Sequence, residues 1–204
     1  VNVFSSTKGI AAICLLQLVE QEKLDLDLPV ANYWPEFAQR GKETIPIRYL
    51  FCHKSGLCGI RKPLDQGAFC NWDLICSELA AQEPLWEPGT AHGYHAITYG
   101  HLVGEVLRRI DGRTIGQYFK EEIAGPLDLD FWIGLPDSEF LRVTELNPSK
   151  PGPMQFLFPL IGKLPKFLIP GPMKFLLDFG DTNTPAGAAF SNPPMQMDPE
   201  KGME

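Results

Sequence analysis

The chain of 204 residues is long enough for one large domain, and its 44 % hydrophobic and 21 % charged residues are ordinary for a globular protein with a buried core. Its net charge of −7, without any run of Lys or Arg, argues against nucleic acid as a partner. The chain begins with Val1 and ends in a polar stretch with no closing element, so we expect a fragment at both ends.

The first predicted element is an apolar helix from Thr7 to about Gln21. Residues 9–19 are apolar almost all round, which is typical of a helix buried at the centre of a protein. Ser5 and Lys8 form an S-x-x-K motif at its start, and a spacing of three residues places both on one helical face. The helix dipole favours negative charge at this end, so it would stabilise a serine alkoxide or an oxyanion. A capping serine and a solvated lysine are the alternative interpretation.

The next part of the chain is expected to be extended up to Pro29 and to form a short packed turn or helix over residues 30–37. Pro46 suits the first turn of a further short helix. A glycine turn after His53 ends that helix. His53 is either a catalytic histidine or a histidine satisfied by the backbone at a helix end.

Three more helices are predicted up to residue 124. Asn71 is a suitable cap for the first of them. The second is amphipathic over residues 96–110 and stops at Gly112, and Thr114 opens a capping box for the third. Residues 5–124 are therefore expected to be mainly helical.

The composition of the sequence changes after Pro136. We predict a helical partial domain in residues 1–137 and a lid-like or irregular extension of the same domain in residues 138–204, where eleven of the nineteen prolines lie between 148 and 204. Residues 154–179 are apolar but interrupted by prolines and lysines, which excludes a transmembrane helix. A lid over a substrate pocket, or packing against other parts of the protein, is favoured over contact with a membrane surface.

The cysteines are odd in number, in a chain too long to need disulfide staples. This favours reduced thiols and a cytoplasmic location, and no signal peptide is visible. Their spacing does not match a structural zinc site. The five are Cys14, Cys52, Cys58, Cys70 and Cys76.

The candidate chemistry is nucleophilic catalysis by Ser5. A serine is a poor nucleophile until a base takes its proton. The candidate bases are Lys8, if burial keeps it neutral, and Tyr94, whose pKa would be lowered beside an ammonium group. A Ser-Lys-Tyr cluster could share one proton and catalyse acyl transfer in both directions. Tyr94 is equally well interpreted as an aromatic plug at a helix start.

Two competing sites involve histidine. A Ser-His-Asp triad is possible in composition, but G-x-S-x-G is absent around Ser5. His92 and His95 could bind a metal together with acidic residues, but an H-E-x-x-H pattern is missing. The four histidines are His53, His92, His95 and His101.

Five short signatures occur in a fixed order along residues 4–129. With them the sequence resembles the serine β-lactamase and penicillin-binding-protein superfamily, specifically its class C-like branch with the family VIII carboxylesterases. Residues 138–204 carry little of the resemblance. The signatures are residues 4–9, 24–30, 47–57, 86–90 with Tyr94, and 123–129.

The resemblance implies an α/β fold of the β-lactamase/transpeptidase type. This chain would be mainly its helical region with the nucleophile helix, lacking most of the sheet. Ser5 corresponds to the acylated nucleophile, Lys8 to its lysine base partner and Tyr94 to the family tyrosine. The backbone N–H of Ser5 would be one oxyanion-hole donor, and neither a metal nor an organic cofactor is implied.

The sequence departs from the family pattern in two places. The lactamase motif Tyr-x-Asn is replaced by Tyr94, His95 and Ala96, and the loss of the amide suits the esterase branch. A K-T-G element, which would supply the second oxyanion donor, is absent. We therefore expect the 204 residues alone to be weakly active or inactive.

The predicted function is hydrolysis of a small ester through an acyl-Ser5 intermediate, with a small-molecule ester or lactam as the substrate. A β-lactamase or D,D-peptidase is the alternative within the enzyme class. A non-catalytic β-lactamase-like protein for binding or assembly is the alternative outside it.

Overall fold

A computed structural model describes most of the first 144 residues and short stretches beyond them. No helix among these residues is long and apolar enough to cross a membrane. The predictions for residues 154–179 concern positions outside the described part, apart from Ile169, Leu177 and Asp178. The described residues are 1–65, 67–144, 169, 177–178, 181, 184–191, 197–198 and 202–203.

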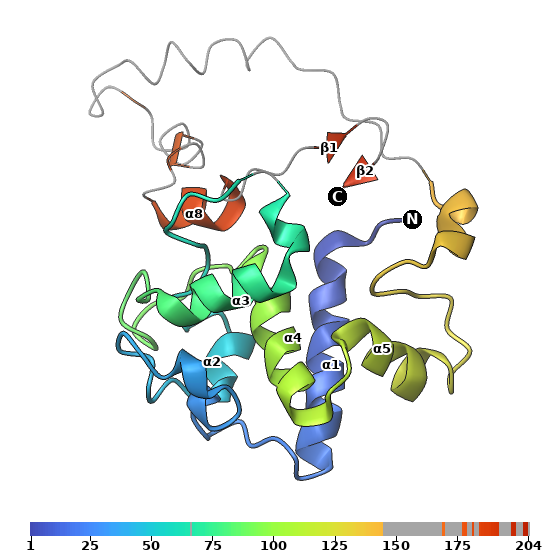
Figure 1. The fold of residues 1–204 in the computed structure, drawn as a ribbon, viewed down its shortest axis with the longest axis horizontal. Helices are drawn as coiled ribbons and strands as arrows, with labels where there is room; N and C mark the ends of the chain where they lie inside the picture. The colour runs from blue at the N-terminus through green and yellow to red at the C-terminus, as the bar shows by residue number, and fades with distance from the viewer. Residues whose placement is uncertain are drawn as a thin grey trace.

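Helix α1 (Thr7–Glu20) lies at the centre of the fold (Figure 1). It follows directly on the 3-10 turn η1 (Phe4–Ser6) and packs against α4 (Thr98–Asp111) and α5 (Ile115–Phe119). The predicted helix from Thr7 to about Gln21 is thus confirmed, and it brings the start of the chain beside the helix that follows Tyr94.

The remaining elements are short. They agree with the prediction that residues 5–124 are mainly helical, and an isolated antiparallel bridge joins Pro29 to Pro46. The two short strands pair antiparallel, Met197 with Met203 and Asp198 with Gly202. The elements are η2 (Val30–Asn32), η3 (Pro35–Phe37), α2 (Ile47–Phe51), η4 (Ala68–Cys70), α3 (Trp72–Ala81), the π-helical turn η5 (Lys120–Ala124), η6 (Asp137–Arg142), α8 (Pro185–Ser191), β1 (Met197–Asp198) and β2 (Gly202–Met203).

The predicted helix ends are largely confirmed. The Asn71 side chain accepts a hydrogen bond from the Leu74 backbone at the start of α3, and Thr114 forms a complete capping box with Gln117. Gly112 ends α4 in the left-handed conformation, with φ of 90°. Pro46 differs from the expectation: it lies one residue before α2, in extended backbone.

The core is built on one side of α1. Leu15 and Leu18 are fully buried because α4 and α5 pack against that side. Ile13 and Leu16 on the other side remain 47 % and 46 % exposed. The expectation of a helix buried all round therefore holds for one face only.

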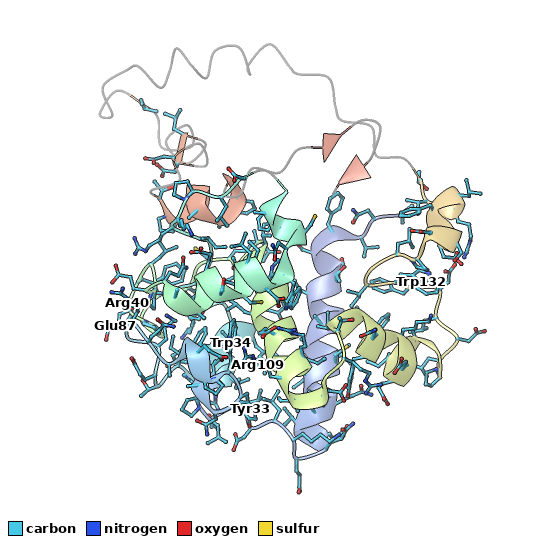
Figure 2. All side chains as sticks on the ribbon, in the orientation of Figure 1. Tyr33, Trp34, Arg40, Glu87, Arg109 and Trp132 are labelled. Carbon is cyan, nitrogen blue, oxygen red and sulfur yellow. The ribbon has the colours of Figure 1, made fainter. Side chains whose placement is uncertain are left out.

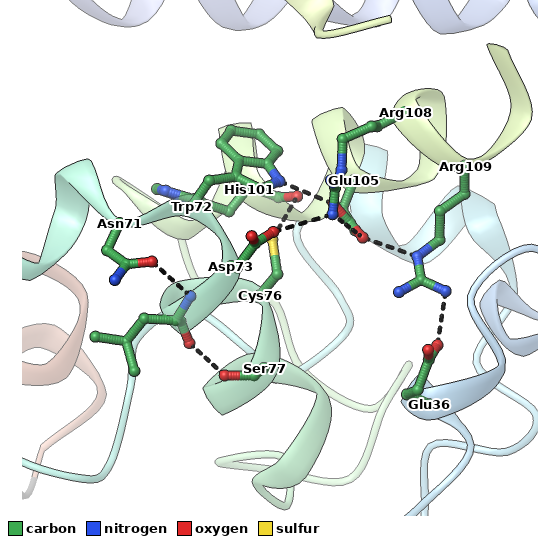
Figure 3. A network of polar contacts seen from close by, with 11 residues as sticks. Glu36, Asn71, Trp72, Asp73, Cys76, Ser77, His101, Glu105, Arg108 and Arg109 are labelled. Carbon is green, nitrogen blue, oxygen red and sulfur yellow. Dashed lines mark hydrogen bonds and ion pairs between the residues drawn. The ribbon is translucent and has the colours of Figure 1, made fainter. Parts of the chain in front are cut away.

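A buried carboxylate joins α3 to α4 (Figure 3). Glu105 is 1 % exposed and accepts hydrogen bonds from Trp72 Nε1, Arg108 Nε and Arg109 Nε, each at 2.8 Å. Burial raises the pKa of Glu105, but these bonds outweigh it and the net pKa lies below the usual value. Gly104 makes room for the indole, since a Cβ there would lie 2.6 Å from the Trp72 ring.

Two further acidic side chains complete this network. Arg109 reaches Glu36 at 2.6 Å, and Arg108 reaches Asp73 at 3.2 Å. The Arg109 guanidinium also lies 5.5 Å from the centre of the Trp34 ring (Figure 2). The Glu105 cluster, meaning Glu105 with Trp72, Arg108, Arg109, Glu36 and Asp73, thus fixes α4 against α3 and η3.

All five cysteines are free thiols, in agreement with the prediction of reduced cysteines. Cys14, Cys58 and Cys76 are buried. Burial raises the pKa of the Cys14 and Cys58 thiols to about 11, so neither is a ready nucleophile near neutral pH.

Candidate active site

Ser5 lies in the turn η1, directly before α1, with its side chain exposed. The preceding Phe4 has φ of 46°, a conformation that is rare for a bulky residue. Left-handed non-glycine residues of this kind cluster at functional sites, where the surrounding structure holds them. The strained residue turns the chain immediately before the serine.

Lys8 links the start of α1 to the segment before α4. Its Nζ lies 3.2 Å from Ser5 Oγ and donates to the backbone carbonyl of Ala96 at 2.6 Å. The same nitrogen lies 4.9 Å from the centre of the Tyr94 ring. The described partners of this ammonium group are therefore neutral ones.

Tyr94 is the third member of the cluster and is 40 % exposed. Partial burial raises the pKa of Tyr94, but its hydrogen bonds with Ser5 and Lys8 and the charge of Lys8 have the larger combined effect. The net pKa of the phenol lies below its ordinary value. A lowered pKa makes the phenolate, the form that can take a proton from a neighbouring hydroxyl, more accessible.

Hydrogen bonds of the buried His95 side chain fix the segment that carries Tyr94, residues 93–96. The His95 side chain is fully buried; its Nδ1 lies 2.6 Å from the Gly93 carbonyl and its Nε2 2.8 Å from Ser55 Oγ. A carbonyl only accepts, so Nδ1 carries the proton and the Ser55 hydroxyl donates to Nε2. Burial lowers the pKa of His95 to about 4, and the ring is neutral at pH 7.

Helix α8 closes one side of this region. It packs against Gly59, where a Cβ would lie 2.2 Å from the backbone of Ala188, and the Cys58 thiol donates to the Pro185 carbonyl at 3.4 Å. The Phe190 ring lies 6.4 Å from the Tyr94 ring, centre to centre. An aromatic side chain from the predicted extension thus borders the site, although the proposed division at residue 137 stays a prediction.

The structure brings together all three side chains that the sequence singled out. Ser5, Lys8 and Tyr94 meet although Tyr94 lies 86 positions beyond Lys8 in the chain; their catalytic roles stay predictions. Among the described residues, no histidine forms a hydrogen bond with Ser5, so the Ser-His-Asp alternative has no geometric support there.

The four histidines do not form one group. His53, His92 and His95 gather beside Tyr94, whereas the His101 ring lies 4.8 Å from the Trp72 ring, centre to centre and tilted by 34°. Sequence reasoning missed the carbonyl of Ala96 as a partner of Lys8 and the contact between Ser55 and His95. The histidine and serine of the turn at residues 53–56 were the available signal, because polar side chains in a glycine turn often bind backbone or neighbouring side chains.

Comparison with known proteins agrees with the resemblance found in the sequence. The sequence model of the family described as Beta-lactamase matches residues 1–193. The chain is 36 % identical over 148 residues to the "Esterase/beta-lactamase LipL" of Mycobacterium tuberculosis, covering 71 % of this chain and 34 % of LipL.

Solved structures agree with this result. The crystal structure of a penicillin-binding-protein homolog from Caulobacter crescentus is 46 % identical with a TM-score of 0.69, covering 72 % of this chain and 40 % of that one. That of a family VIII carboxylesterase is 44 % identical with a TM-score of 0.71, covering 72 % and 41 %. The chain thus spans well under half the length of these relatives.

Proposed function

Because the chain belongs to the β-lactamase family, with the β-lactamase/transpeptidase-like fold, we propose that the protein is a serine hydrolase that cleaves small carboxylic esters through an acyl-Ser5 intermediate. One observation carries the proposal: Lys8 Nζ stands 3.2 Å from Ser5 Oγ, and the same nitrogen lies 4.9 Å from the centre of the Tyr94 ring. The names of the relatives LipL, an esterase/beta-lactamase, and of the family VIII carboxylesterase are consistent with this chemistry.

The acylation step begins when Ser5 Oγ attacks the ester carbonyl carbon and its proton passes to Tyr94 as phenolate. The ammonium of Lys8 stabilises that phenolate, as the lowered pKa of Tyr94 supports. The backbone N–H of Ser5 would face the oxyanion, and losing such a donor costs about 3 kcal/mol.

The intermediate then collapses. The bond from the acyl carbon to the alcohol oxygen breaks, and the leaving alkoxide takes the proton from Tyr94. Water repeats the sequence in the deacylation step: it gives a proton to Tyr94, attacks the acyl carbon and releases the carboxylic acid, while Ser5 Oγ takes the proton back. Each proton is returned, so the three side chains regain their starting state and one water molecule is consumed for each ester.

Esters are favoured over lactams by the residue at position 96. The amide of the Tyr-x-Asn motif is replaced by the methyl group of Ala96, which is buried, and the carbonyl of this residue is occupied by Lys8. A lactam substrate would lose the amide as a polar partner. A relative named as an esterase, EstB of Burkholderia gladioli, is 29 % identical to the chain.

The test compares ester and lactam turnover in the natural protein in full. We expect hydrolysis of p-nitrophenyl butyrate that falls at least about a thousandfold in Ser5→Ala, with labelling of Ser5 by a fluorophosphonate probe. Ser6→Ala, the neighbouring hydroxyl, serves as the matched control and keeps the activity. Faster turnover of nitrocefin than of the ester would instead support a β-lactamase. Failure of the probe to label Ser5 would support a non-catalytic protein.

A further inference from the structure

His53 lies against the segment that carries Tyr94, next to the candidate site. It follows α2 with φ of 58°, in the left-handed conformation. Its ring centre lies 5.1 Å from that of Tyr94, 5.3 Å from that of His95 and 5.2 Å from that of Tyr99. The half-buried imidazole therefore lies among aromatic side chains of residues 93–96 and of α4.

Two hydrogen bonds tie His53 to this loop. Its backbone carbonyl accepts from the Gly93 N–H at 3.2 Å, and its ring Nδ1 accepts from the His95 N–H at 3.2 Å. An imidazole nitrogen accepts only when it is unprotonated, so the ring is neutral with its proton on Nε2. Protonation at Nδ1 would set two donors against each other and break the second bond.

The loop held in this way supplies two partners of Lys8. Residues 93–96 present the Tyr94 ring above Lys8 Nζ and the Ala96 carbonyl, which accepts from Lys8 at 2.6 Å. A shift of this loop would move both partners away from Ser5 together. A misplacement of about 1 Å at a catalytic group can cost about a hundredfold in rate.

The surroundings of His53 keep the ring neutral. Burial lowers its pKa to about 4, and the charges of His92 and Lys8 add to the effect. The titratable groups that face it are Lys8 from α1, Tyr99 from α4, and His92, Tyr94 and His95 from the loop. None of these is a carboxylate that would favour the charged ring.

We propose that His53 is a positioning residue of the Ser5–Lys8–Tyr94 site: through Nδ1 its neutral ring holds residues 93–96 so that Tyr94 and the Ala96 carbonyl reach Lys8. It does not act as the general base. The inference rests on the proposed ester hydrolysis for its effect on rate, but the hydrogen bond and its influence on Tyr94 can be measured separately.

The kinetic test uses two variants of the natural protein in full. His53→Ala removes the acceptor, and we expect kcat for p-nitrophenyl butyrate to fall about 10- to 100-fold with little change in KM. His53→Asn keeps a side-chain acceptor and tolerates the left-handed backbone, so kcat stays within about threefold of the wild type. The pH profile of His53→Asn between pH 5 and 9 keeps the limbs of the wild type, because the His53 ring is already neutral in this range and causes none of them. A His53→Asn variant as impaired as His53→Ala, whose residual activity lacks an acid limb seen in the wild type above pH 5, would show that His53 is the base. Unchanged kinetics of His53→Ala would also overturn the proposal.

A spectroscopic test separates this inference from the proposed function. NMR of labelled His53 and Tyr94 should show a neutral His53 ring with its proton on Nε2 at pH 7. The Tyr94 pKa should rise in His53→Ala and stay low in His53→Asn. If the wild type neither hydrolyses esters nor reacts with the probe while these signals appear, the proposed function fails and the positioning contact stands. If the wild type is active but the Tyr94 pKa is the same in all three proteins, the positioning role is wrong.

Discussion

Two polar clusters in this protein are built against α4, and they differ in how their charges are compensated. In the Glu105 cluster a carboxylate that is 1 % exposed receives hydrogen bonds from an indole and two guanidinium groups. At the start of α1, Lys8 instead meets a hydroxyl, a phenol and a backbone carbonyl, and no carboxylate pairs with it among the described residues.

The difference separates a cluster that stabilises the fold from one that is suited to move a proton. A buried charge with all its partners in place has little freedom to change its protonation state without a large cost. A lysine among neutral groups near the surface can exchange a proton with its neighbours. Its lowering of the Tyr94 pKa indicates that the two groups are coupled.

The largest effect is expected from the loss of Lys8. Lys8→Ala should lower kcat/KM for ester hydrolysis by about 10²- to 10⁴-fold, the usual contribution of a positioned acid or base. Because its partners are neutral and near the surface, we expect the free energy of unfolding to change by about 1 kcal/mol or less. Kinetics and urea unfolding measure the two quantities. Lys23→Ala, at an exposed lysine just beyond α1, is the control and should alter neither.

Loss of Glu105 should have the opposite effect: a large loss of stability and no change in kcat. Glu105→Ala leaves two arginines and an indole without their common acceptor, and we expect a loss of about 3–5 kcal/mol in the free energy of unfolding. The kcat of the protein that remains folded should not change. Asp73→Ala removes an exposed partner of Arg108 from the same cluster and should cost about 1 kcal/mol or less. Equal costs for the two variants would show that burial is not what distinguishes Glu105.

The free energy of unfolding should depend on pH in different ranges for His95, in the loop beside Lys8, and for Glu105. The folded-state pKa of His95, about 4, lies below the ordinary value of 6.5, so the unfolded chain binds more protons between these values. Stability is therefore full above about pH 6.5 and falls as the pH drops towards 4, by about 3 kcal/mol from His95 alone. The lowered pKa of Glu105 gives a contribution that is lost only below its ordinary value of 4.5.

Urea unfolding between pH 4 and 7 measures this loss. His95→Gln, which keeps polar groups but does not titrate, should reduce the dependence between pH 4 and 6.5 and leave the part that comes from His53, whose pKa is also lowered to about 4. His92→Asn, at an exposed histidine of the same loop, is the control and should change the slope less than His95→Gln does. A slope unchanged by His95→Gln would show that this ring is not buried in its neutral form.

Local signals in the sequence predicted local structure well. The cap at Asn71 and the capping box at Thr114 depend on residues three positions apart, which a sequence displays directly. Contacts between distant residues carry no such signal: the bonds from Lys8 to Ala96 and from Trp72 to Glu105 join positions 88 and 33 apart. The pairing of Lys8 with Tyr94 was one of two equal interpretations of the residues, and the family resemblance favoured it.

The same limit explains the misjudged burial of α1. An apolar residue signals burial but does not name its partner, and the sequence could not show that α4 and α5 would contact one side of the helix only. Likewise, the turn at His53 was visible in the sequence, but the His95 N–H that its ring accepts comes from a loop 42 positions away.

The smallest effect tests where the Glu105 cluster ends. Asn71 caps α3 beside Trp72 and Asp73, and its Oδ1 accepts from the Leu74 N–H at 3.0 Å (Figure 3). Asn71→Ala should cost about 1 kcal/mol of unfolding free energy, the usual value of a helix cap, and leave ester hydrolysis unchanged. Asn71→Asp, which caps equally well, should stay within a few tenths of a kcal/mol of the wild type. A cost of about 3 kcal/mol for Asn71→Ala would mean that the cap positions Trp72 for Glu105, and that the cluster extends to the first turn of α3.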